Sequence, residues 1–270
     1  MRGANRTTDP GPPALTSLDE PYRTRAAPPG SSRHLAWLFS APVARAPLLG
    51  IFALLAEWRA TLQADTAPEV ATTKLAWWRD EIQRLRQARP VHPIGRYLLA
   101  SVTAMPSDWA PLERAIEAAA RQAGGAVLDT AADRADHADA LIGGPLRVAA
   151  TLGVEARDRA ADPAVRALEA CTRAIAAGEL LAPTAAAGEP VHAGALRAAA
   201  RREYVAAVDA LPPVARARYR GLLVLAVLEA HHLSTGRPGT TMPARLSDLF
   251  LAWRTARRAA RADSRTPEIP

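Results

Sequence analysis

The carboxylates best suited to metal chemistry lie in one short polar segment, LDTAADRADHADA, at residues 128–140. Asp129, Asp133 and Asp136 follow one another at i, i+4 and i+7, so a helix would present them on one face. Oxygen ligands of this kind suit Mg²⁺. The competing interpretation is a solvated helix face, because Arg134 lies among the aspartates and charge runs usually face water. We favour the solvated face and keep the metal site as the alternative.

A second candidate for chemistry is the segment KLAWWRDEI at residues 74–82. Lys74, Trp77, Trp78 and Glu81 share one face of a predicted helix. Tryptophan there could line an apolar cavity, and a cation can bind over its ring. The simpler interpretation is that Trp77 or Trp78 packs in the core, since large aromatic side chains dominate core burial. We favour the core.

The remaining potential ligands and nucleophiles stand alone or point apart. Cys171 is the one cysteine, which excludes a disulfide framework and favours a small buried side chain. His231 and His232 are adjacent, so on a helix they face different directions and cannot readily chelate one ion. We expect one of the two to be buried and the other exposed. No serine-hydrolase motif and no phosphate-binding glycine loop occurs.

Composition and charge restrict the class of protein. The 270 residues are 49% hydrophobic, and the formal charge of +7 comes almost wholly from arginine because Lys74 is the only lysine. Arginine binds phosphates, carboxylates and anionic lipid surfaces. No zinc-finger, RNP-type or helix-turn-helix pattern accompanies it, so we expect no nucleic-acid partner. The longest apolar runs, such as GLLVLAVLEA at 221–230, are too short to cross a bilayer. We expect a cytoplasmic protein, peripheral to the inner membrane surface at most.

The whole chain after residue 30 is predicted to be helical. Caps, prolines and glycines place the helices, and no window shows strand alternation. Residues 1–30 are rich in proline and predicted to be disordered. The expected organisation is one all-α domain over 31–262 with a disordered tail at 263–270. The first expected helices are 31–40, 47–64 and one that is capped by Thr66 and Glu69 and ends near 88. The next open at His92-Pro93, at a Ser107 cap, and at 126, the last of these with a break at Gly143-Gly144-Pro145. The later ones are 163–178, 192–210, 213–233 and one that begins at Ser247.

Two segments resemble the squalene/phytoene synthase family. RHLAWLFSAPVARAPLLGIFALLAEW at 33–58 is similar to the family's Leu-Phe-x-Pro segment, arginine and first long helix. KLAWWRDEIQRLRQARPVHPIGRYLL at 74–99 is similar to its Trp-Trp-Arg helix and the His-Pro that opens the next one. The resemblance covers residues 33–100. It continues more weakly over DHADALIGGPLRVAATLG at 136–153, where the family's tyrosine is missing.

The resemblance implies a single-domain helical bundle of the isoprenoid synthase, or trans-prenyltransferase, type. Active members join two prenyl diphosphates and need Mg²⁺ on aspartate-rich motifs to neutralise the leaving pyrophosphate. The first such motif falls on Arg59, Ala60, Gln63 and Ala64, none of which is a carboxylate. The second should fall within 167–190, a window without aspartate. The chain therefore resembles the family's degenerate branch, which includes relatives of a respiratory complex I assembly factor.

We accordingly expect a catalytically silent protein that binds a lipid or prenyl ligand, or that acts in assembly at a membrane surface or in a protein complex, without a cofactor. The residues expected to line the inherited cavity are Arg45, Glu57, Lys74, Trp77 and Trp78. The alternative is an active head-to-head prenyltransferase with Mg²⁺ on displaced carboxylates, namely Asp129, Asp133 and Asp136. A third hypothesis is an unrelated helical adaptor.

Overall fold

The computed structural model describes residues 18–63, 65–101, 108–152, 168–169, 171–173, 175–176, 202, 205–206, 211–235 and 242–263. Every regular element within these ranges is a helix, which confirms the predicted all-α class. In chain order the elements are α1 (Glu20–Ala26), α2 (Ser32–Phe39), α3 (Pro42–Thr61), α4 (Pro68–Arg86), α5 (Pro93–Ser101), α6 (Ala110–Ala123), α7 (Ala131–Ala138), the π-helical turn η1 (Asp139–Gly143), α8 (Gly144–Thr151), α11 (Pro213–Arg218), α12 (Arg220–Thr235) and α13 (Met242–Asp263).

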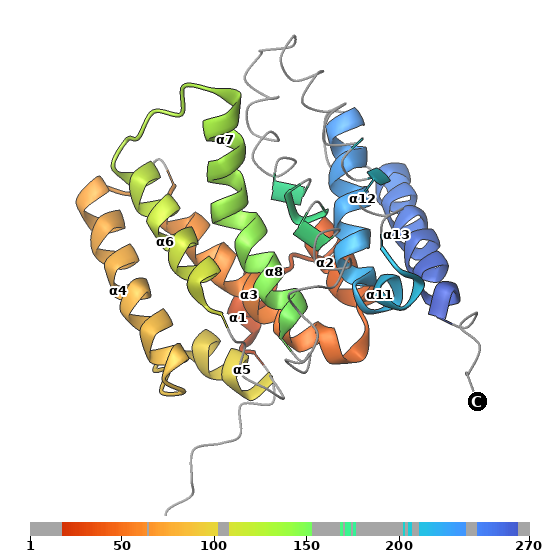
Figure 1. The fold of residues 1–270 in the computed structure, drawn as a ribbon, viewed down its shortest axis with the longest axis horizontal. Coiled ribbons are helices and arrows are strands. Elements are labelled where there is room, and N and C mark those ends of the chain that lie inside the picture. Colours follow the sequence, from red (N-terminus) through yellow and green to blue (C-terminus); the bar gives the residue numbers. More distant parts are fainter. Residues whose placement is uncertain are drawn as a thin grey trace, which may run out of the picture.

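Helix α3 is the centre of the core. It contacts α1, α2, α4, α5 and α8, and its side chains are buried almost without interruption from Pro47 to Leu55. This confirms the prediction that an apolar helix with no polar face is buried. The buried apolar side chains of the helices from α1 to α13 form one continuous cluster around it. In Figure 1, α4 and α6 lie on one side of α3, and α12 and α13 lie on the other.

The prediction of disorder was wrong for residues 18–30. Helix α1 forms there, with Pro21 in its first turn, where the missing N–H breaks no helical hydrogen bond. Leu18, Ala26 and Ala27 are buried in the core cluster, and α1 packs on α3. Composition hid this helix because its stability comes from packing against a distant segment.

Several predicted helix boundaries also differ from the structure. Helix α3 begins at Pro42, so Pro47 lies inside it and not at its start as predicted. The expected helix 213–233 is divided into α11 and α12. Helix α4 begins at Pro68 after Ala67, whose side chain makes no cap, so the capping box of Thr66 and Glu69 does not form. The predicted break at Gly143-Gly144-Pro145 does not occur, because α7, η1 and α8 run on without interruption. The N–H of Gly144 bonds to the carbonyl of Asp139, five residues back. This π-type turn accommodates Pro145, which an uninterrupted α-helix would not.

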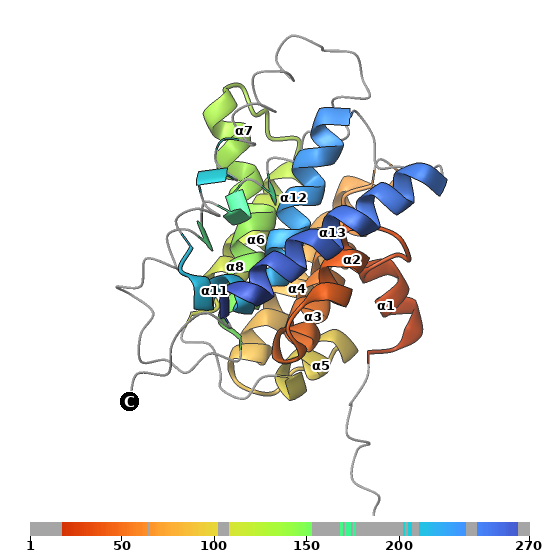
Figure 2. The same cartoon turned by 90° about the vertical axis from the view of Figure 1, so that its right-hand side faces the viewer.

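The C-terminal helices form the outer side of the bundle. Helix α13 begins at Met242, so Ser247 lies inside the helix and not at its cap as predicted. It packs on α11, α12 and α2. Figure 2 shows α13 lying obliquely across the face of the molecule that α12 and α2 support. None of the described helices combines the length and the apolar character needed to cross a membrane.

Candidate functional site

The C-terminal end of α3 carries the positions that the family resemblance assigns to the first metal-binding motif. Arg59 and Ala60 are exposed in its last turn. Gln63 follows the helix, and its side-chain amide donates to the carbonyl of Arg59 at 2.9 Å. Ala64 lies outside the described residues. This end of α3 therefore presents a cation and an amide that is bonded to its own backbone.

The structure separates Arg45 and Glu57, two of the residues expected to share a ligand cavity. Arg45 is exposed, and its guanidinium donates to the carbonyls of Ser40 at 3.2 Å and Leu38 at 3.0 Å. It therefore caps the C-terminal end of α2. Glu57 forms an ion pair with Arg25 of α1 at 2.8 Å. Arg45 thus links α3 to α2, and Glu57 links α3 to α1.

The tryptophans of α4 lie together, and they differ in burial. Trp78 is buried and packs on His92 and Trp58 at ring separations of 4.7 and 6.4 Å. Trp77 is 40% exposed and contacts Trp78 at 5.2 Å. Lys74 is exposed on the same helix. The cluster is a packed aromatic core with one ring at its edge, which agrees with the interpretation that we favoured for Trp78.

A buried carboxylate that sequence reasoning did not single out for this role lies beside these rings. Glu81 is 1% exposed, and its Oε1 accepts hydrogen bonds from the N–H groups of Val91 at 2.9 Å and His92 at 2.8 Å. Its Oε2 pairs with Arg84 at 2.8 Å. The ring of His92 in turn accepts from the N–H of Ile94. Glu81 and His92 therefore hold the connection between α4 and α5, and burial lowers the pKa of His92.

The proposed face of three aspartates is not formed. Asp129 precedes the helix, whose N-cap is Thr130. Asp133 forms a capping box with Thr130, and the hydrogen bond from the Thr130 hydroxyl lowers the pKa of this exposed carboxyl. Asp136 is exposed on α7, while the neighbouring His137 is buried and bonded to Gln122 at 3.0 Å. Among the residues that the structure describes, no three His, Cys, Asp or Glu side chains lie close enough to hold a metal ion.

An ion pair across the π-helical turn is a further feature that the sequence did not reveal. Arg147 binds Asp139 with two hydrogen bonds of 2.7 and 2.9 Å and donates a third to the hydroxyl of Thr172 at 3.1 Å. A side chain at Gly143 would collide with the Asp139 carboxylate. The extra residue of the turn therefore allows Asp139 and Arg147 to meet, and their pairing fixes α8 against the segment that contains Thr172. Cys171 is buried there, which raises the pKa of its thiol to about 12 and makes it a poor nucleophile.

A polar chain links α2, α12 and α13. The Ser32 hydroxyl lies 3.3 Å from Nδ1 of His232, and Nε2 of His232 lies 3.0 Å from Asp248. The other oxygen of Asp248 lies 4.0 Å from Nε2 of His231, so both histidines approach one carboxylate. His232 is the more buried of the two, but both are partly buried, so the predicted division into one buried and one exposed histidine is met only in direction. Although Ser, His and Asp in this order can activate a nucleophile, here they bridge three packed helices and fix the orientation of α13.

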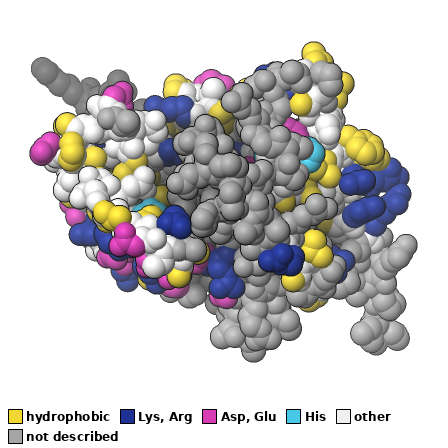
Figure 3. Space-filling model, turned by 90° about the horizontal axis from the view of Figure 1, so that it is seen from above, with side chains coloured by type: hydrophobic (Ala, Val, Ile, Leu, Met, Phe, Trp, Pro, Cys, Tyr) yellow, Lys and Arg dark blue, Asp and Glu magenta, His cyan; other side chains and the backbone are white. Residues whose placement is uncertain are grey.

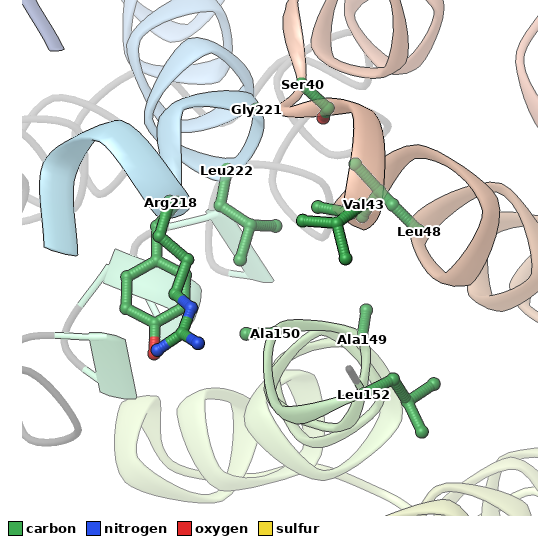
Figure 4. A pocket seen from close by; sticks show the side chains of 11 residues that line it. Ser40, Val43, Leu48, Ala149, Ala150, Leu152, Arg218, Gly221 and Leu222 are labelled. Atoms are coloured by element: carbon green, nitrogen blue, oxygen red, sulfur yellow. The ribbon is translucent and has the colours of Figure 1, made fainter. Parts of the chain in front are cut away.

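A small pocket lies where α3, α8 and α12 meet (Figure 4). It holds about 50 Å³, enough for a few water-sized groups and far below the roughly 300–1,000 Å³ of ligand sites. Figure 4 shows Val43 and Leu222 facing Ala149 and Ala150 across it. None of the five expected cavity residues lines it.

Comparisons with known proteins add no further assignment. No family model, no curated protein and no solved structure matches this chain. The family resemblance therefore depends on the motifs within residues 33–100 and, more weakly, 136–153.

Proposed function

We propose that this chain is a catalytically silent protein of the isoprenoid-synthase-type helical fold, and that it acts by binding at a membrane or in the assembly of a membrane complex. One observation carries the proposal. The end of α3 presents Arg59, Ala60 and Gln63 at the positions where the resemblance assigns metal-binding carboxylates.

The loss of these carboxylates matters because the pyrophosphate that leaves during the reaction is highly charged. Condensation of prenyl diphosphates needs Mg²⁺ to neutralise pyrophosphate, and Mg²⁺ takes octahedral oxygen ligands. Arg59 repels a cation, and the Gln63 amide donates to the carbonyl of Arg59. The carboxylates of α3 and α4 that point inward have other partners: Glu57 pairs with Arg25, and Glu81 binds two backbone N–H groups and Arg84. Neither of these two carboxylates is free to bind a magnesium–diphosphate cluster.

The arrangement of the first helices supports the fold type. A buried α3 is followed by α4 with its paired tryptophans, and α5 begins at Pro93 directly after His92. This is the order that the resemblance implies. The small pocket between α3, α8 and α12 cannot enclose a prenyl chain, so binding at the surface is favoured over binding inside this pocket.

Release of pyrophosphate tests the proposal. Purified protein is incubated with farnesyl or geranylgeranyl diphosphate and Mg²⁺, and we expect release no faster than in a protein-free blank. Steady release that Asp133→Ala abolishes and Asp80→Ala leaves intact would contradict the proposal and support the active prenyltransferase with displaced carboxylates. Asp80 is a suitable control because it is an exposed carboxylate on α4, away from the capping box. Mass spectrometry of co-purified lipids and proteins tests the binding role.

A further inference from the structure

Helix α13 has most of its large apolar side chains on the outside, whereas Leu251 is partly buried against the core. The side chains that it buries are small or polar: Asp248, Ala252, Ala256 and Ala259. The side chains that it exposes include five large hydrophobic ones: Met242 at 72%, Leu246 at 58%, Leu249 at 42%, Phe250 at 58% and Trp253 at 41%. A helix of a soluble bundle normally shows the opposite distribution. These five side chains therefore do not pack in the core.

These five residues form a stripe along the helix. Their spacing from Met242 to Trp253 places them on adjacent turns of one face, beside the face that packs on α12 and α2. We call this the α13 stripe. Figure 3 shows hydrophobic and basic side chains gathered on the side of the molecule where α13 lies.

The exposed charged side chains that the structure describes on α13 all have one sign. Five arginines of α13 are exposed, at positions 245, 254, 257, 258 and 261. Asp248 is the carboxylate among the described side chains of α13, and it is directed inward to His232. The guanidinium of Arg254 lies 5.9 Å from the ring of Phe250, and that of Arg257 lies 5.1 Å from the ring of Trp253. The stripe therefore combines aromatic rings with cations that lie beside them, which suits an interface between apolar and anionic material.

The bundle holds the stripe in a fixed orientation. Asp248 is anchored to His232, which reaches Ser32 of α2. The alanines of the buried face allow close packing on the neighbouring helices. Rotation of α13 to bury its large side chains would expose the apolar core and break the Asp248–His232 bond.

We propose that α13 binds the surface of an anionic lipid bilayer, lying in the plane of the headgroups. The α13 stripe enters the boundary between headgroups and acyl chains, and the flanking arginines bind lipid phosphates. Charge complementarity favours this occupant over a second copy of the chain, because two such faces would bring ten arginines together. The inference names the partner in the proposed binding role and rests on that role.

Vesicle sedimentation tests the inference with the full chain. We expect the protein to bind vesicles of phosphatidylcholine and phosphatidylglycerol, and to bind pure phosphatidylcholine far more weakly. The triple variant Arg254→Gln/Arg257→Gln/Arg258→Gln should lose on the order of 100-fold in affinity for the anionic vesicles. The double variant Phe250→Ser/Trp253→Ser should lose about tenfold or more. High salt should weaken the wild type and change the arginine variant little.

Matched controls lie on α4, on the other side of the molecule (Figure 1). Val70→Ser removes an apolar side chain that is 47% exposed, and Arg79→Gln removes an exposed arginine. Both should bind anionic vesicles like the wild type. All variants should keep the helical circular dichroism of the wild type, because the altered side chains are exposed. Brominated lipids should quench tryptophan fluorescence in the wild type and much less in Trp253→Phe.

The inference fails if the wild type binds neither kind of vesicle, if it binds both equally, or if the α13 variants bind like the controls. Concentration-dependent dimers that the double variant abolishes, without vesicle binding, would instead assign the stripe to a second copy. The two proposals fail separately. Absent vesicle binding with no pyrophosphate release overturns this inference alone, whereas vesicle binding with pyrophosphate release overturns the catalytically silent role alone.

Discussion

Helices α4 and α13 are two long helices on opposite sides of the bundle, and they use their large side chains in opposite ways (Figure 1). Helix α4 buries Leu75, Trp78, Ile82 and Leu85. Helix α13 buries alanines and exposes both of its aromatic residues and most of its large aliphatic ones, with Leu251 partly buried. The number of large apolar residues in a helix therefore does not predict which of its faces packs against the core. The size of the side chains on the buried face decides how closely the helix lies against its neighbours.

Each of the two helices also buries one carboxylate, with different consequences. Glu81 of α4 is 1% exposed and binds the backbone of the following connection. Asp248 of α13 is 5% exposed and binds His232 of the neighbouring helix. In α4 the buried acid fixes where the chain goes next. In α13 the bond to His232 holds the buried face against α12, and the α13 stripe is turned to solvent.

Two tryptophans make the contrast measurable. Trp78 of α4 is 5% exposed and Trp253 of α13 is 41% exposed. Trp78→Ala should lower the free energy of unfolding by about 3–5 kcal/mol, since it leaves a cavity among packed rings. Trp253→Ala should lower it by less than about 1 kcal/mol, as expected of a surface change. Urea unfolding followed by circular dichroism gives both values. Equal losses would show that α13 packs through its stripe.

The buried acid of α4 gives the next largest effect. Glu81→Ala leaves the N–H groups of Val91 and His92 without their acceptor and should cost about 2–3 kcal/mol of unfolding free energy. Glu81→Gln should cost less, because one side-chain oxygen can still accept both bonds. Asp80→Ala is the matched control, since Asp80 is exposed on the same helix, and it should stay within about 0.5 kcal/mol. A loss as large for Asp80→Ala as for Glu81→Ala would disprove the anchoring role.

Local sequence signals predicted a large part of the fold. The all-α class, the burial of α3 and the start of α5 after His92 were correct, because each follows from apolar periodicity or from a proline at a helix start. Helix α1 was missed because its stability comes from contact with α3. The continuous helix through Gly143-Gly144-Pro145 was missed because a π-type turn has no clear sequence signature.

The contacts of the candidate site were harder to predict, for a related reason. The role of Glu81 depends on where Val91 and His92 return, ten and eleven residues later. The pairing of Asp139 with Arg147 depends on the extra residue of the π-helical turn. The expected face of three aspartates did not form because α7 starts after Thr130, which leaves Asp129 outside the helix. Spacing along the chain predicts a shared face only where the helix boundaries are known.

The partly buried His92 after α4 and the buried His137 of α7 should give the smallest effect, a dependence of stability on pH. Burial lowers the pKa of both His92 and His137 from the ordinary value of 6.5, and Arg121 adds to this lowering at His137. The unfolded chain then binds more protons than the folded protein in mildly acidic solution, so the unfolding free energy falls as pH decreases through 6.5 and levels off below the folded pKa values. The double variant His92→Asn/His137→Gln, which keeps a polar group near each bonded ring nitrogen, should show a flatter profile in urea unfolding from neutral to acidic pH. A wild-type profile that rises on acidification, or an unchanged slope in the variant, would show that these rings are not the groups that destabilise the protein in acid.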